Sequence, residues 1–288
     1  MPLRESAFAH RIRRSSTLRK PAIATYRAID RVRPAPPGPR VVANSIPKAG
    51  THLVTALLDQ LPGFRYSGRF VQLEASHFAH PETAASELQK NIRRVRTSSY
   101  MTTHLPALSP ITDVLAASDV RTVMAIRDPR ALAVSAFNYL RTAEHVGSRD
   151  EVLGMFPTDE ALMDAIVHGY GEPGDPLSAP PIEVLFNAYA GWLDQPGVLT
   201  VRFEDLVGSQ GGGASDSQVE QVARILDHIG VEDAGKVAPV YAERIFNTGA
   251  MTFHSGTIDG WRGQLAPAHV AHIEEMCGDA MARLGYVG

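Results

Sequence analysis

The sequence has very little cysteine and no long apolar run. Cys277 is the single cysteine among 288 residues, so the chain can form neither an internal disulfide nor a thiolate cage for zinc. No apolar stretch approaches the roughly 18 to 20 residues that a membrane-spanning helix needs. The first 20 residues are rich in arginine and lack the apolar segment of a secretory signal. These features together predict a cytoplasmic protein.

The sequence also lacks the phosphate-binding pattern of nucleotide triphosphatases. That pattern ends in Gly-Lys-Ser or Gly-Lys-Thr, which place the lysine on the phosphates and the hydroxyl on magnesium. Neither tripeptide occurs in the chain. A magnesium-dependent ATPase or a kinase-like phosphotransferase is therefore disfavoured, and we expect a site without a metal.

Charge is distributed unevenly along the chain. The first 40 residues carry ten basic and two acidic side chains, a net charge of +8, while the remainder carries −11. This basic leader ends in the proline-rich run Arg33 to Pro39, which is typical of an extended linker. We therefore expect an N-terminal arm, residues 1–39, and one domain, residues 40–288. Such an arm either stays solvated or contacts a membrane surface or a polyanion.

Short apolar runs alternate with helical patterns after residue 40. The runs that we expect as buried strands are 41–46, 98–104, 120–126 and 198–203. The helical patterns that follow three of them are 53–61, 130–142 and 217–229. This alternation predicts an α/β fold, in which helices flank a mostly parallel central sheet. No internal repeat and no second domain is indicated.

The loop after the first expected strand has the composition of an anion site. Lys48 supplies a positive charge, Gly50 lets the backbone approach an oxyanion closely, and Thr51 and His52 offer donors in the first helical turn. Ligands of open α/β sheets bind at this kind of place, where a strand ends and a helix begins. We therefore expect a phosphate group here, and the alternative is a plain strand-to-helix turn with a surface lysine.

Five segments resemble, in chain order, the motifs of the sulfotransferases that use 3'-phosphoadenosine 5'-phosphosulfate (PAPS). They are 46–53 (Ile-Pro-Lys-Ala-Gly-Thr-His-Leu), 103–106 (Thr-His-Leu-Pro), 127–137, 203–206 (Phe-Glu-Asp-Leu) and 253–262. The resemblance implies the P-loop-like sulfotransferase fold and a metal-independent reaction. In that reaction a sulfonyl group moves from PAPS to a hydroxyl of a small molecule, lipid, natural product or sugar, and 3'-phosphoadenosine 5'-phosphate (PAP) is released.

The resemblance also implies roles for individual residues. Lys48 would stabilise the leaving phosphate, and His104 would be the general base. The implied contacts of the nucleotide are Lys48, Ala49, Gly50, Thr51, His52, Leu53, Arg127, Ser135, Phe203, His254, Ser255 and Gly256. Among these, Arg127 and Ser135 would hold the 3'-phosphate through a guanidinium fork and a hydroxyl.

Four positions named here depart from the family pattern. Leu53 stands where the family often has an aromatic residue that stacks on adenine, and Thr102 stands where a lysine commonly precedes the Thr-His pair. In the last segment His254 and Ser255 replace an arginine and a lysine that grip the 3'-phosphate. The 3'-phosphate would then depend mainly on Arg127.

Two alternatives stay open. Glu74, which precedes a His-Phe pair, is an alternative base because related carbohydrate sulfotransferases use a glutamate before a similar segment. The alternative function is a catalytically impaired nucleotide or nucleic-acid binding module of the same fold. Retention of both Lys48 and His104 argues against that module.

Overall fold

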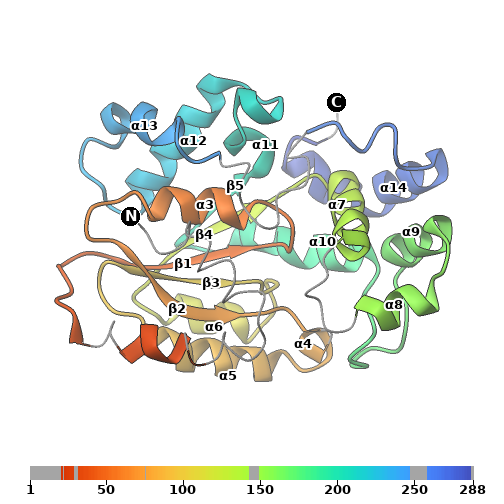
Figure 1. Cartoon of the computed structure of the whole chain (residues 1–288), viewed down its shortest axis with the longest axis horizontal. Helices are drawn as coiled ribbons and strands as arrows, with labels where there is room; N and C mark the ends of the chain where they lie inside the picture. Colours follow the sequence, from red (N-terminus) through yellow and green to blue (C-terminus); the bar gives the residue numbers. More distant parts are fainter. Residues whose placement is uncertain are drawn as a thin grey trace.

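The computed structural model describes residues 21, 23–28, 32–74, 76–142, 149–246 and 258–286. Within these residues five parallel strands form one sheet in the order β2-β3-β1-β4-β5 (Figure 1). The strands are β1 Arg40–Ser45, β2 Arg65–Val71, β3 Ser99–Thr103, β4 Arg121–Ile126 and β5 Val198–Arg202. The expected α/β fold with a central parallel sheet is confirmed.

Helices cover both faces of the sheet, because alternate side chains of each strand point to opposite faces. Val41 and Ala43 pack with one group of helices, whereas Val42 packs with the other. The first group is α3 Thr51–Leu58, α11 Phe203–Leu206, α12 Ser215–His228 and α13 Ala234–Ala242 (Figure 1). The second group is α5 Pro81–Ile92, α6 Ile111–Ala116, α7 Pro129–Thr142, α9 Asp159–His168, α10 Ile182–Ala190 and α14 Pro267–Arg283. The shorter elements are α4 Ser76–Ala79, α8 Arg149–Met155, η1 Gly191–Asp194 and η2 Ser209–Gly211.

The strand order reverses beside the central strand. After β1 the chain builds β2 and β3 on one side and β4 and β5 on the other side of β1. Open α/β sheets bind ligands outside the carboxyl ends of the strands at such a point. The loop between β1 and α3 lies at this point (Figure 1).

The edge strand β2 was not expected from the sequence. Its sequence, Arg-Tyr-Ser-Gly-Arg-Phe-Val, has no continuous apolar run, and Gly68 adopts a φ of 71°. The pairing with β3 also shifts register between Tyr66 and Phe70, which is the mark of a bulge. Polar residues are tolerated in this strand because it has a neighbour on one side only.

The described part of the N-terminal arm packs against the domain. Within the helical residues 23–28, the Tyr26 hydroxyl donates to the carbonyl of Tyr66 at 2.5 Å, and Arg27 donates to the carbonyl of Gly68 at 2.8 and 3.1 Å. A Cβ on Gly68 would lie 3.2 Å from the Tyr26 ring, so a glycine suits this close approach. The proline-rich run also contacts the domain, because the Ser98 hydroxyl donates to the carbonyls of Pro36 and Pro37 at 3.2 and 3.1 Å.

No helix in the described parts of the chain combines the length and apolar character needed to cross a membrane.

Candidate functional site

The loop between β1 and α3 has a backbone shape that few side chains allow. Gly50 precedes α3 with a φ of 93°, and Lys48 has a φ of 73°. A Cβ on Gly50 would lie 2.8 Å from the Phe203 ring, so a larger residue would push the loop away from Phe203. Ala49 is fully buried, and its amide donates to the carbonyl of Ile46 at 3.0 Å. The loop therefore turns tightly into a helix N-terminus, whose dipole favours an anion.

Two cationic side chains meet at this loop. The Arg127 guanidinium donates to the carbonyl of Lys48 at 3.3 Å and lies 4.2 Å from the centre of the Phe203 ring. The Lys48 ammonium lies 4.1 Å from the centre of the Tyr139 ring. Burial, together with the smaller effect of the Arg127 charge, lowers the pKa of Lys48 to about 8. Burial also lowers the pKa of Arg127. Two partly desolvated cations side by side fit a ligand that carries more than one negative charge.

His104 is held as a neutral base. Its Nδ1 lies 2.8 Å from the carbonyl oxygen of Ser45. A carbonyl can only accept, so Nδ1 carries the proton and Nε2 keeps its lone pair. The pKa of His104 is lowered to about 4, chiefly by burial, with the hydrogen bond to Ser45 opposing and the charge of Lys48 reinforcing the change. At neutral pH the ring can therefore accept a proton at Nε2.

A buried amide fixes the segment that carries His104. Asn44, at the end of β1, donates to the carbonyl of Leu105 and accepts from the amide of Leu105, both at 2.9 Å. It also accepts from the Thr103 hydroxyl at 2.8 Å. These bonds tie the end of β3 to β1 on either side of His104. Sequence reasoning did not single out Asn44, because its role depends on strand pairing between residues 59 and 61 positions apart.

The hydroxyl and aromatic neighbours of His104 come from three elements. The Ser45 hydroxyl lies 3.1 Å from Nδ1 and 2.5 Å from the Thr51 hydroxyl, which links the base to the start of α3. The Phe70 ring meets the His104 ring edge to face, with 5.3 Å between centroids, and Phe70 is 40 % exposed. Phe70 was missed because β2 was missed.

Ser135 lies on the same side of α7 as a contact of Lys48. Residues four apart share a helix face, and Ser135 is four residues before Tyr139, whose ring contacts Lys48. Ser135 is half-buried. The structure therefore brings Lys48, Arg127 and the helix face of Ser135 to one region, as expected for a phosphate site.

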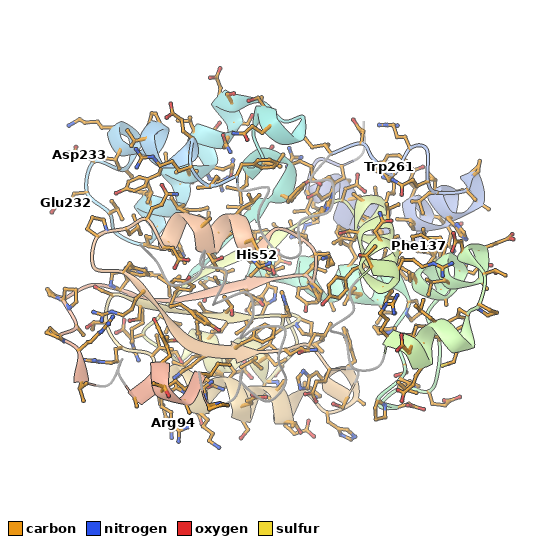
Figure 2. The ribbon with its side chains drawn as sticks, viewed as in Figure 1. His52, Arg94, Phe137, Glu232, Asp233 and Trp261 are labelled. Atoms are coloured by element: carbon orange, nitrogen blue, oxygen red, sulfur yellow. The ribbon has the colours of Figure 1, made fainter. Side chains whose placement is uncertain are left out.

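Other expected contacts of the nucleotide are placed differently. Leu53 is buried in the core cluster on the α3 side of the sheet, and one of its methyl groups lies 3.6 Å from the place where a Cβ on Gly50 would stand, so its side chain packs under the loop. Phe203 is buried under Arg127 and supports that guanidinium. His52 lies in the first turn of α3 (Figure 2). His254, Ser255 and Gly256 lie outside the described residues.

The carboxylates near Arg127 orient the chain. Glu204 accepts from the amide of Asp128 at 3.1 Å and from the Tyr286 hydroxyl at 2.9 Å. Burial raises the pKa of Glu204, although these hydrogen bonds oppose the change. Asp128 in turn pairs with Arg130 at 2.6 Å. Both carboxylates therefore form bonds that hold the chain in place.

Two further residues from the sequence are located by the structure. Trp261 is buried between the guanidiniums of Arg130 and Arg262, which lie 4.3 and 4.6 Å from a Trp261 ring centre (Figure 2). Glu74, the alternative base, has an exposed side chain 4.0 Å from Nε2 of His77.

The family model of the sulfotransferase domain matches residues 39–285. The chain belongs to the sulfotransferase family. Carbohydrate sulfotransferase 2 of Mus musculus and of Homo sapiens are each 29 % identical over 203 residues, which cover 59 % of this sulfotransferase and 35 % of the relative. The chain thus spans about a third of the length of the curated relatives it matches.

Solved structures share the fold of this sulfotransferase. Mouse sulfotransferase SULT7A1, complexed with PAP, superposes with a TM-score of 0.54 at 14 % identity, over 84 % of each chain. Retinol dehydratase, in complex with androsterone and the inactive cofactor PAP, superposes with a TM-score of 0.53 at 16 % identity. That superposition covers 86 % of this chain and 82 % of the other.

Proposed function

We propose that the chain is a PAPS-dependent sulfotransferase that transfers a sulfonyl group to a hydroxyl of its acceptor. The observation that carries this proposal is the neutral His104 ring, whose Nδ1 bonds to Ser45 beside the cationic loop of Lys48. Transfer from a phosphosulfate to a hydroxyl requires a base close to an anion site, and here both lie at the carboxyl ends of neighbouring strands. Family membership and the PAP complexes of structural neighbours support the donor.

The residues at the loop fit the donor. Lys48 supplies positive charge from within the loop and Arg127 supplies it from a side chain bonded to the carbonyl of Lys48, and Gly50 lets an oxyanion approach the backbone closely. Ser135 and Arg127 are the described side chains that we assign to the 3'-phosphate. We assign the 5'-phosphosulfate to Lys48, Thr51 and the amides at the start of α3.

The chain's residues act on the acceptor proton and on the developing charge. PAPS supplies an electrophilic sulfonyl group joined to phosphate through a bridging oxygen. His104 Nε2 takes the proton of the acceptor hydroxyl as its oxygen bonds to sulfur and the bond from sulfur to the bridging oxygen breaks. The Lys48 ammonium stabilises the negative charge left on the phosphate. Asn44 and Ser45 keep the ring oriented.

We propose a carbohydrate hydroxyl as the first acceptor class to test. The similarity to carbohydrate sulfotransferase 2 supports this choice, and phenols, lipid alcohols and natural-product alcohols form the comparison set. We also retain a cytoplasmic location and contact of the basic arm with a polyanion or membrane surface as proposals that rest on the sequence. The impaired-module alternative is disfavoured, because Lys48 and His104 meet at one site with the base unprotonated.

The test combines binding and transfer. Calorimetric titration of PAP and AMP should give at least about tenfold tighter binding of PAP, since the 3'-phosphate adds a charge-assisted contact. Sulfonyl transfer from labelled PAPS should then be followed over a panel of saccharides, phenols and aliphatic alcohols. Equal affinity for PAP and AMP would remove the donor assignment. Tight PAP binding without transfer to any acceptor class would favour the impaired module.

A further inference from the structure

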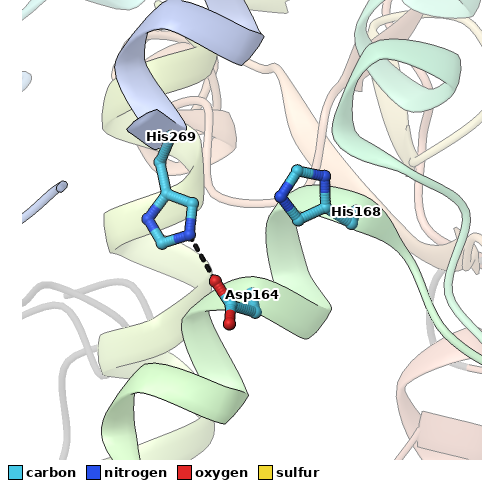
Figure 3. Close-up of side chains that lie close together, drawn as sticks. All are labelled: Asp164, His168 and His269. Carbon is cyan, nitrogen blue, oxygen red and sulfur yellow. Dashed lines mark hydrogen bonds and ion pairs between the residues drawn. The ribbon is translucent and has the colours of Figure 1, made fainter. Parts of the chain in front are cut away.

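A cluster of histidine and acidic side chains joins α9 to α14, on two helices that carry none of the residues assigned to the transfer site. Asp164 and His168 are four residues apart on α9 and therefore share one face of that helix. His269 reaches the same place from the first turn of α14 (Figure 3). Each of the three side chains offers one potential metal-binding atom, and these three atoms all lie within 4.8 Å of one another.

The geometry of the cluster is convergent. His269 Nε2 lies 2.5 Å from a carboxylate oxygen of Asp164, and Figure 3 shows a nitrogen of His168 on the side that faces this pair. The His168 ring centre is 6.0 Å from that of His269 and 4.4 Å from that of His272. Three imidazoles and a carboxylate therefore gather between two helices.

The nitrogen of His269 that faces the cluster is Nε2, and the residue is 8 % exposed. Nδ1 of the same ring is buried on the side away from Asp164 and has no hydrogen-bond partner among the described residues. The metal-binding atoms are therefore His269 Nε2, a carboxylate oxygen of Asp164 and a nitrogen of His168, and their convergence defines the site.

We propose that Asp164, His168 and His269 bind a divalent transition-metal ion of the zinc type, which ties α9 to α14. Imidazole nitrogens with one carboxylate oxygen are a donor set that zinc prefers, with water in the fourth position. Zinc lies at about 2.0 to 2.2 Å from such ligands, so its ligand atoms are about 3.4 Å apart. To reach that spacing, Asp164 and His269 would have to open from 2.5 Å and His168 would have to move inward. His272 packs against His168 and would hold its ring in place.

This ion would be structural and separate from sulfonyl transfer. Helix α14 also carries Glu274, which pairs with Arg130 at 2.6 Å beside the segment of Arg127. Metal binding at the start of α14 would therefore stabilise the folded state without adding a ligand to the transfer site.

The experiment is a calorimetric titration of tag-free, chelator-treated protein with zinc chloride. Wild type should bind one zinc ion and melt at a higher temperature in its presence. His168→Ala and Asp164→Asn, both exposed positions that should tolerate substitution, should each weaken zinc binding by at least about tenfold. The control His80→Ala, an exposed histidine paired with Glu82 elsewhere, should bind zinc as wild type does.

The outcomes separate this proposal from the proposed function. PAP affinity should be unchanged in His168→Ala, because the cluster does not touch the nucleotide site. Absence of stoichiometric zinc binding in wild type would overturn the metal site, as would wild-type zinc affinity in both His168→Ala and Asp164→Asn. Failure of PAP binding in wild type would instead count against the proposed function and leave the zinc titration to decide the metal site by itself.

Discussion

The neighbouring side chains Lys48 and His104 both have lowered pKa values, yet at neutral pH they are in different charge states. Burial lowers both pKa values, to about 8 and about 4. Between these values the lysine remains charged while the histidine remains neutral. At neutral pH the site therefore has a charged Lys48 for the leaving phosphate and an unprotonated His104 Nε2 for the acceptor proton.

The pH dependence of donor use should report these two groups. His104 is neutral above its pKa of about 4, so kcat/KM for PAPS should stay high at pH values where an ordinary histidine would already be protonated. Lys48 loses its charge above its pKa of about 8, so kcat/KM should fall on the alkaline side. Initial rates from about pH 4 to 10 measure both limbs. Lys48→Arg should move the alkaline limb upward, and an acid limb near the ordinary histidine pKa would contradict the assignment.

Lys48→Ala and His104→Ala should fail in different ways. Lys48 acts on the donor before and during transfer, so its loss should weaken PAP binding and slow turnover. Loss of the base should leave PAP affinity within a few-fold and lower kcat by about 10² to 10⁴. Calorimetry and single-turnover assays separate the two effects. Glu74→Ala is the matched control and should keep near-normal turnover. An inactive Glu74→Ala beside an active His104→Ala would transfer the role of base to Glu74.

Arg127→Ala should discriminate between nucleotides. A charge-assisted bond to phosphate is worth about 1.5 to 3 kcal/mol, so PAP affinity should fall about ten- to hundred-fold. AMP lacks the 3'-phosphate and should lose much less, with a small effect through the hydrogen bond from Arg127 to the carbonyl of Lys48. Titration of both ligands measures the difference. An equal loss for PAP and AMP would mean that Arg127 supports the loop alone.

At the scale of elements, four strands were predictable within one or two residues. Strands β1, β4 and β5 are short, mostly apolar runs, and β3, Ser-Tyr-Met-Thr-Thr, is rich in threonine and tyrosine, which favour strands. Strand β2 was not predictable, because Gly68 and the two arginines of Arg65–Val71 interrupt any such run. Its residues form a strand only because β3 offers a free edge, which is a tertiary effect. The loss of β2 from the prediction also removed Phe70 from the expected site.

The segment after α14 should contribute to stability through one hydroxyl. Tyr286 donates to the buried Glu204 at 2.9 Å, and its own carbonyl accepts from Arg130 at 2.9 Å. Tyr286→Phe leaves the carboxylate with one donor fewer, so the free energy of unfolding should fall by about 1 to 3 kcal/mol. Urea unfolding measures the change. Tyr241→Phe, in helix α13, is the control and should change the free energy of unfolding less. Equal effects would mean that ring packing, rather than the hydroxyl, matters at residue 286.

At the scale of the molecule, the site is assembled from the ends of β1, β3 and β4 and from one face of α7. The order of motifs was enough to predict that Lys48, His104 and Arg127 come together, since parallel strands end at one edge. It could not predict that the carbonyl of Ser45 sets the protonated nitrogen of His104, or that Asn44 fixes its segment. Those bonds depend on strand register, which no local pattern encodes.

The effect of deleting the N-terminal arm on the melting temperature should depend on which residues are removed. The sequence alone predicts that residues 1–39 can be removed without loss of fold. The contacts of Tyr26 and Arg27 with β2 change that expectation, so removal of residues 1–39 should lower the melting temperature more than removal of residues 1–20. Thermal unfolding of both variants measures this, with PAP affinity as the check on the transfer site. Equal melting temperatures of the two variants would mean that residues 21–39 do not stabilise the domain.

The contacts of Tyr26 and Arg27 fall on backbone carbonyls of an edge strand, and this bears on how the protein behaves at high concentration. An edge with open carbonyls is a template on which a strand of another molecule can dock. By occupying the carbonyls of Tyr66 and Gly68, the two side chains close that template without adding a strand of their own. The basic arm would then hinder association of molecules through β2, and its removal should favour concentration-dependent association through this strand.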